Sequence, residues 1–114
     1  MSDREKTIAM ALDLFLSQLS RVQEVAQTMQ KIYGANLRPR IRSSSVAEIE
    51  NLGRMISTLE KGEISAEIIA YSAGMCEKSI DYDLFCVEAG SSSLQCRATA
   101  QAWLELSSDL ERFQ

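Results

Sequence analysis

The sequence contains no histidine, the side chain that most often serves as a general base and as a ligand for transition metals. Its absence excludes the Ser-His and Cys-His pairs that activate nucleophiles in many enzymes. Asp81 and Asp83 flank a tyrosine, but the further oxygen ligands and the glycine of a calcium loop do not follow them. We therefore expect a protein that is not an enzyme and that holds neither a metal nor a cofactor.

Long apolar runs are also missing. The longest uncharged apolar stretch, IIAYSAGMC, has about half the residues of a membrane span, and no apolar segment of a signal peptide follows the charged opening MSDREK. The cysteines are odd in number and fit neither a CxxC motif nor a zinc site; they are Cys76, Cys86 and Cys96. Such thiols are typical of a reducing compartment, so we expect a cytoplasmic protein.

The residues that are present are typical of one globular domain. The length of 114 residues is close to the commonest domain size, and a hydrophobic content of 46% argues against a disordered chain. Only 6% of the residues are aromatic, so the core must depend on aliphatic side chains. We expect residues 1–114 to form a single domain.

The first helix is predicted to end at Tyr33. Ser2 and Glu5 have the spacing of a capping box at its start, and the next glycine or proline is Gly34, a typical helix stop. Apolar residues recur between these ends at alternating steps of four and three, which predicts a helix of about 45 Å. These residues are Ile8, Leu12, Phe15, Leu19, Val22, Ala26, Met29 and Tyr33.

The apolar stripe of this helix is wider than a single neighbouring helix covers. Leu14, Val25 and Ile32 fall together about 90° to one side of the seam. The apolar arc spans about 160°, whereas a surface helix needs little more than 100°. Either the helix is central to a four-helix bundle or one flank contacts another chain, and a dimer satisfies both. The candidate interface residues are Ala11, Leu14, Phe15, Leu19, Val22, Val25, Met29 and Ile32.

The segment GANLRPRIRSSS, residues 34–45, is the one substantial linker. Apolar and basic residues alternate within it; they are Leu37, Pro39 and Ile41, and Arg38, Arg40 and Arg42. Proline is excluded from helix interiors, and a period of two is typical of extended backbone. We therefore predict an extended strap that presses its apolar residues onto the domain and turns its arginines outward.

Serine caps predict the helices that follow the strap. Ser45 and Glu48 form a second capping box, and the helix that they open is predicted to stop near Gly62. Ser65 is then the expected cap of a third helix.

The last part of the chain predicts one more helix. Residues 81–88 have strand-like composition in a helix-like context, and we favour helix there. Ser92 and Gln95 have capping-box spacing, and an apolar seam then runs to Phe113. The fold class predicted from these segments is all-α, a small bundle of about four helices with a long N-terminal helix, and we expect the bundle to dimerise.

Charge is distributed unevenly in this acidic chain. Residues 1–57 carry a net charge of +2, and residues 58–114 carry −6, which sum to the overall −4. Three arginines are few for nucleic-acid binding, because three phosphate contacts give a salt slope of only about −3. We therefore expect the strap to meet an acidic protein surface: that of this chain, of a second subunit or of another partner. We expect no direct binding of nucleic acid, membrane or small molecule.

Three classes of function fit these features. The first is a dimeric regulator that presents an apolar helix flank to a target protein. The second is a small acidic dimeric chaperone of the secretion type, although such chaperones more often mix helix with sheet. The third is a helical DNA-associated regulator or antitoxin, which the acidity and the missing recognition helix disfavour.

The chain resembles the small bacterial antiactivators of quorum sensing. The resemblance is carried by the opening MSDREKTIAMALDLFLSQLSRVQEVAQTMQ, the strap LRPRIR and the ending CRATAQAWLELSSDLERF, and it covers length and helix order. It implies a dimer that docks on the ligand-binding domain of a LuxR-type acyl-homoserine-lactone receptor. Such docking would cover the surface through which the receptor dimerises and would prevent DNA binding without contact with DNA. The resemblance assigns no individual contact residues.

Overall fold

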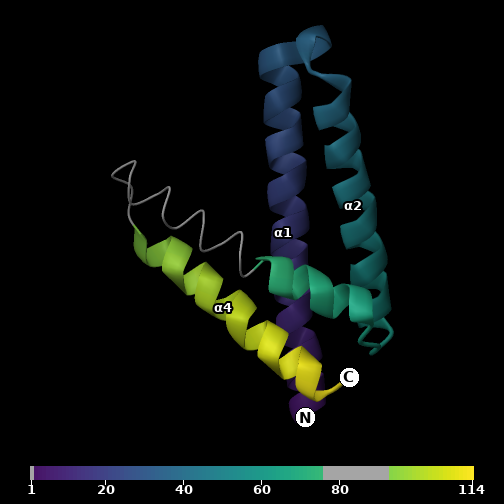
Figure 1. Ribbon diagram of the computed structural model, residues 1–114, viewed down its shortest axis with the longest axis vertical. Coiled ribbons are helices and arrows are strands. Elements are labelled where there is room, and N and C mark those ends of the chain that lie inside the picture. The colour runs from purple at the N-terminus through teal and green to yellow at the C-terminus, as the bar shows by residue number, and fades with distance from the viewer. Residues whose placement is uncertain (1, 76–92) are drawn as a thin grey trace.

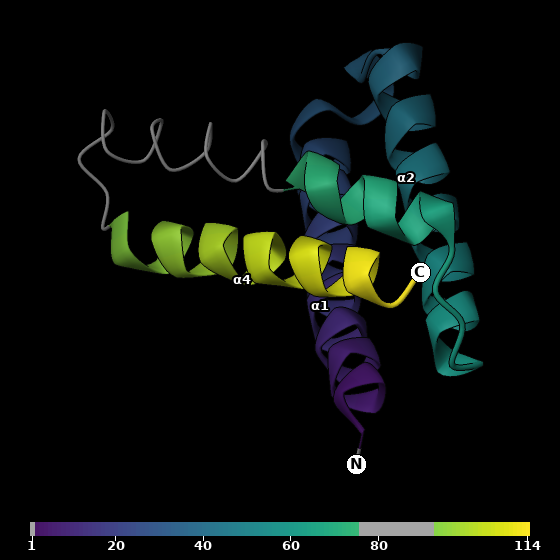
Figure 2. The same cartoon turned by 60° about the horizontal axis from the view of Figure 1, so that its bottom comes forward.

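The computed structural model describes residues 2–75 and 93–114. All regular secondary structure in these ranges is helical, so the predicted all-α fold class is confirmed. The elements are α1 (Asp3–Tyr33), the short 3-10 helix η1 (Gly34–Asn36), α2 (Pro39–Glu60), a helical segment at 66–75 and α4 (Ser93–Arg112). Helices α1 and α2 lie side by side as a long hairpin, and the other two helices cross the half that holds the N-terminus (Figures 1 and 2).

The ends of α1 are those predicted from the sequence. The Ser2 side-chain oxygen accepts a hydrogen bond from the Glu5 backbone N–H at 3.2 Å, which satisfies one of the free donors of the first turn. At the other end, Gly34 has a positive φ of 52° and its N–H donates to the carbonyl of Gln30. Glycine adopts this backbone without steric cost, so the helix ends there.

The predicted extended strap is wrong, because α2 begins at Pro39. Proline is well tolerated in the first turn of a helix, where its missing N–H has no helical partner to lose. Only Leu37 and Arg38 are extended, with ψ angles of 125° and 131°. Ser45 therefore lies inside α2, and the capping box predicted there does not exist.

The later helix boundaries agree better with the sequence. Helix α2 ends at Glu60, and Gly62 follows with a φ of 79°. The Ser65 hydroxyl oxygen accepts a hydrogen bond from the Ile68 backbone N–H at 3.3 Å, as expected of a cap. The last helix runs to Arg112, close to the end of the chain.

Some predictions concern parts that the structure does not describe. They are the helix at 81–88, the cap at Ser92, the residues Cys76 and Cys86, and the side chains of Cys96 and Ile41.

The hydrophobic core lies where the helices cross. Phe15, Tyr71 and Trp103 come from three different helices, and their ring centroids are separated by 5.4 to 6.2 Å. The buried cluster takes nothing from α1 beyond Phe15 and nothing from α2 before Leu52. Its members are Ile8, Ala11, Phe15, Leu52, Met55, Ile56, Leu59, Ile68, Met75, Trp103, Leu106 and Leu110.

Candidate functional site

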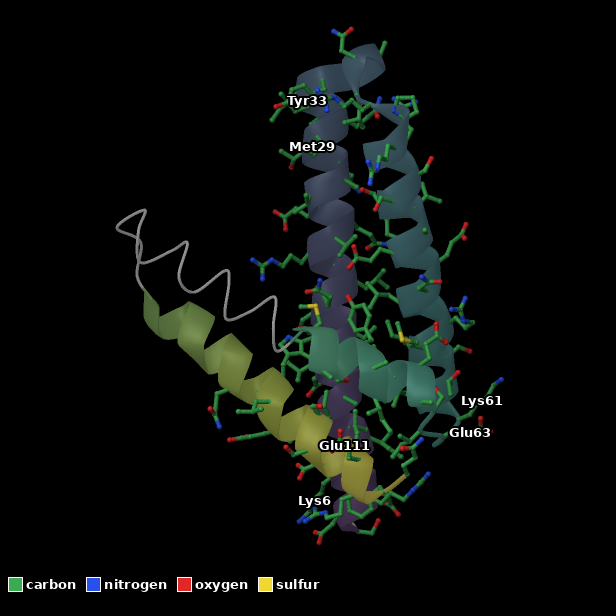
Figure 3. All side chains as sticks on the ribbon, viewed as in Figure 1. Lys6, Met29, Tyr33, Lys61, Glu63 and Glu111 are labelled. Atoms are coloured by element: carbon green, nitrogen blue, oxygen red, sulfur yellow. The ribbon has the colours of Figure 1, made fainter. Side chains whose placement is uncertain are left out.

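The outer half of the hairpin, residues 22–49, is the candidate site, and we call it the hairpin tip. It lies beyond the last core residues of both helices, Phe15 on α1 and Leu52 on α2. Figure 3 shows Met29 and Tyr33 at this end, far from Lys6, Lys61, Glu63 and Glu111 at the other. Among residues 2–75 and 93–114, no third helix lies over the tip, whereas the segment at 66–75 and α4 cross the other half of the hairpin (Figure 1).

One flank of α1 passes from the covered half to the tip. Leu14 is half-buried and packs against the core. Val25 and Ile32 lie on the same flank, because 11 and 7 residues complete nearly whole turns of a helix. Their exposed fractions are 55% and 66%. The sequence correctly placed the three side chains on one face, but only the two in the tip are accessible.

A shallow apolar groove of about 140 Å³ lies between the two helices of the tip. Helix α1 supplies two of its apolar residues, and the connection and α2 supply the others. Leu37 is buried with an exposed fraction of 8%, whereas Val46 is 50% exposed. The apolar lining consists of Ala26, Met29, Leu37, Val46 and Ile49.

Arg42 lines the same groove and connects its two walls. Its Nη2 donates to the Gln30 side-chain oxygen at 3.4 Å and to the Gly34 carbonyl at 3.3 Å. The Gly34 carbonyl also accepts the Leu37 backbone N–H at 3.2 Å, so Arg42 is a second donor to the turn that follows α1. Arg42 thus helps to hold the first turns of α2 against the end of α1.

The tip is cationic although the protein is acidic. Residues 22–49 contain four basic side chains and two glutamates, Glu24 and Glu48, and they leave the remainder with 8 basic and 14 acidic residues, a net charge of −6. The four are Lys31, Arg38, Arg40 and Arg42. The ion pairs seen among the described residues lie elsewhere, namely Arg54 with Glu67 and Arg112 with Asp109.

The structure separates the predicted interface residues into three groups. Ala11 and Phe15 are fully buried in the protein's own core, so they stabilise the fold. Leu14, Leu19 and Val22 are half-buried and pack against that core. Val25 and Ile32 are exposed, and Met29 lines the groove; these three lie in the tip beyond Val22, which is its first residue.

The contribution of α2 to this surface was predictable only in part. Val46 and Ile49 are three residues apart, which places them on one helix face, and both fall within the helix predicted to follow Ser45, but nothing in the sequence placed that face against α1. The predicted extended strap also left Arg42 outside the helix, whereas the structure places it in the first turns of α2.

A polar contact marks the border between tip and core. The Tyr71 hydroxyl donates to a Glu48 carboxylate oxygen at 3.1 Å. Burial raises the pKa of Tyr71, and the negative charge and hydrogen bond of Glu48 raise it further. The contact joins α2 to the helical segment at 66–75.

The described residues hold no group of three side chains suited to a metal ion, and none of the described helices has the length and apolarity needed to cross a membrane. The surface that the structure does offer is an apolar groove with a cationic rim. Comparisons of the chain with protein-family models, with curated proteins and with solved structures found no match.

Proposed function

We propose that this protein is an antiactivator of quorum sensing that binds a LuxR-type receptor through the hairpin tip. The observation that carries the proposal is the uncovered apolar surface of the tip, formed by the flank of Val25 and Ile32 and by the adjacent groove. Exposed apolar surface of this kind is typical of protein-binding sites. The sequence resemblance supplies the class of target.

The proposed mechanism is competition for a dimer interface. A receptor surface that pairs with a second receptor is apolar, because obligate dimer interfaces resemble a domain core cut in half. The tip offers an apolar surface that can replace the second receptor. Binding of the receptor monomer then removes it from the monomer–dimer equilibrium by mass action, and DNA binding is lost as a consequence.

The antiactivator itself is proposed to be a homodimer. The flank that carries Val25 and Ile32 continues the flank that the protein's own helices cover at Leu14. We propose that a second copy covers the exposed part of this flank. Self-association through this flank then leaves the adjacent groove of the tip for the target.

The test is co-purification with the lactone-bound ligand-binding domain of a LuxR-type receptor, followed by the molar mass from light scattering. The proposal predicts a stable complex in which the receptor domain is no longer paired with a second receptor domain. If the receptor domain elutes alone as a dimer in the presence of excess protein, the proposal is wrong.

A further inference from the structure

We infer that the groove of the hairpin tip binds an acidic amphipathic helix of the partner protein. The inference rests on the proposed protein-binding function and names the chemistry of the element that is bound. Three properties of the tip carry it: the apolar lining between two helices, the satisfied backbone of both walls and the cationic rim.

The apolar lining requires an apolar face on the partner. Met29 and Ile49 are half-buried on opposite walls, and Val46 is 50% exposed. The longer wall of the groove is supplied by α2 between Arg42 and Ile49 and is about 12 Å long. A partner helix that places about two turns in the groove matches this length, with apolar residues at steps of three and four.

The backbone of the tip favours a helix over an extended segment. Both walls are helices whose N–H and C=O groups bond within the helix, apart from those in the last turn of α1 and the first turn of α2, so they offer no continuous free edge to a strand. An extended partner would bury backbone groups without hydrogen-bond partners. A helix arrives with these groups already paired, and it adds a third layer to the two helices that the structure describes in the tip (Figure 1).

The rim requires negative charge on the partner. Arg38 and Arg40 are exposed at the junction of the two helices, and Arg42 reaches the groove itself. In the tip, residues 22–49, four basic side chains outnumber the two carboxylates of Glu24 and Glu48, so an incoming acidic side chain meets a net charge of +2. Opposite charges around an apolar centre are the usual arrangement of specific protein interfaces.

Other anionic partners fit the tip less well. A lipid surface would contact outward-facing residues such as Val25 and Ile32, but it would not enter a groove whose floor includes the buried Leu37. Nucleic acid would use the cations, but four phosphate contacts give a salt slope of only about −4, and the apolar lining would gain nothing.

The test measures binding of designed peptides by fluorescence anisotropy. The first probe is a labelled amphipathic peptide of about 18 residues, long enough to become helical, with leucine and isoleucine on one face and glutamate on the other. The second has lysine at every glutamate position. Vesicles with anionic phosphatidylglycerol and a double-stranded DNA oligomer are the competing probes.

Two variants with the same charge change locate the site. Arg38→Glu with Arg40→Glu reverses the rim at the start of α2, and Arg4→Glu with Lys6→Glu makes the same change at the start of α1. Acidic residues near a helix N-terminus are favourable, so both double variants are expected to fold. Circular dichroism checks this.

The inference predicts that the glutamate peptide binds and the lysine peptide does not. It also predicts affinity that falls with added salt, a loss of about tenfold in the Arg38 and Arg40 variant, and a change of less than about twofold in the control. Equal losses in both variants, equal binding of both peptides, or preference for vesicles or DNA would overturn it. Because no receptor takes part, this result is independent of the LuxR-type target.

Discussion

At the scale of single residues, three aromatic rings determine how the helices cross. The chain has few aromatic residues, and Phe15, Tyr71 and Trp103 meet in pairs with tilted or edge-on rings. Such pairs contribute about 0.5–1.5 kcal/mol beyond the burial of their surface. Tyr71 adds a second role, because its hydroxyl reaches Glu48 and fixes the segment at 66–75 on α2 where the tip begins.

This hydroxyl has a predictable effect on stability. Tyr71→Phe keeps the ring but removes the hydrogen bond to Glu48, and we expect the unfolding free energy at neutral pH to fall by about 1 kcal/mol. Urea unfolding followed by the fluorescence of Trp103, the only tryptophan, measures this change. A variant as stable as the original protein would show that the contact contributes nothing.

The same residue predicts a pH dependence. The pKa of Tyr71 is raised above its ordinary value of 10.0, so the folded state retains the proton that the unfolded chain releases. The contribution of the Tyr71 proton to the unfolding free energy is fully present below about pH 10 and is lost as the pH rises toward the folded-state pKa of Tyr71. The unfolding free energy of the original protein should therefore fall more steeply above about pH 10 than that of Tyr71→Phe. Parallel curves would contradict the assignment.

At the scale of elements, the two halves of α1 are supported in different ways. Its first half is covered by other helices and contributes every α1 residue of the core, ending at Phe15. Its second half is supported by α2, by Leu37 in the connection and by Arg42. Local stability follows the number of buried contacts, so the tip is expected to open more readily than the core half.

Arg42→Ala tests whether the hydrogen bonds of Arg42 hold the start of α2 against the end of α1. The hydrogen bonds of Arg42 are exposed and 3.3 Å or longer, so we expect the global unfolding free energy to fall by less than about 1 kcal/mol. Amide hydrogen exchange in residues 30–38 should nevertheless accelerate about threefold, because α1 loses a contact at its end. Arg54→Ala is the control, since Arg54 pairs with Glu67 beside the core. Equal acceleration of the tip in both variants would contradict this role.

Local signals explain which element boundaries were predictable. Ser2, Gly34 and Ser65 act on their own neighbouring turns, and the sequence placed all three correctly. Pro39 was misread because proline fits both an extended strap and the first turn of a helix. The choice between the two depends on how α2 packs against α1, which the six residues of LRPRIR do not reveal.

The site was predictable only in part for a related reason. Helical periodicity places Leu14, Val25 and Ile32 on one flank, but it does not say where other helices cross that flank. The covering of Leu14 and the exposure of Val25 are consequences of contacts between segments far apart in the chain. The groove likewise needs both α1 and α2, so no single pattern along the sequence shows it.

At the scale of the whole molecule, the positively charged tip lies at one end of the long axis. The protein measures 48 × 32 × 19 Å, and its long axis runs along the hairpin from the N-terminal end of α1 to the tip (Figure 1). The tip has a net charge of +2, whereas the rest of the chain has a net charge of −6. A net positive tip on an acidic protein favours the approach of an acidic partner to the tip.

The central claim is that the partner binds the hairpin tip. Two double variants test it, because each adds two carboxylates at exposed apolar positions. Val25→Asp with Ile32→Asp changes the tip, and Leu16→Asp with Leu104→Asp changes other surfaces, at 47% and 53% exposure. All four side chains are outside the core, so both variants should keep the helical circular-dichroism spectrum of the original protein.

The decisive measurement is calorimetric titration of the lactone-bound receptor domain with both variants and the original protein. The account predicts an affinity at least about thirtyfold lower for the tip variant, since a carboxylate in an apolar interface loses its water without gaining a partner. The Leu16 and Leu104 variant should bind within about threefold of the original protein. Undiminished binding by the tip variant, or an equal loss in both, would contradict the account.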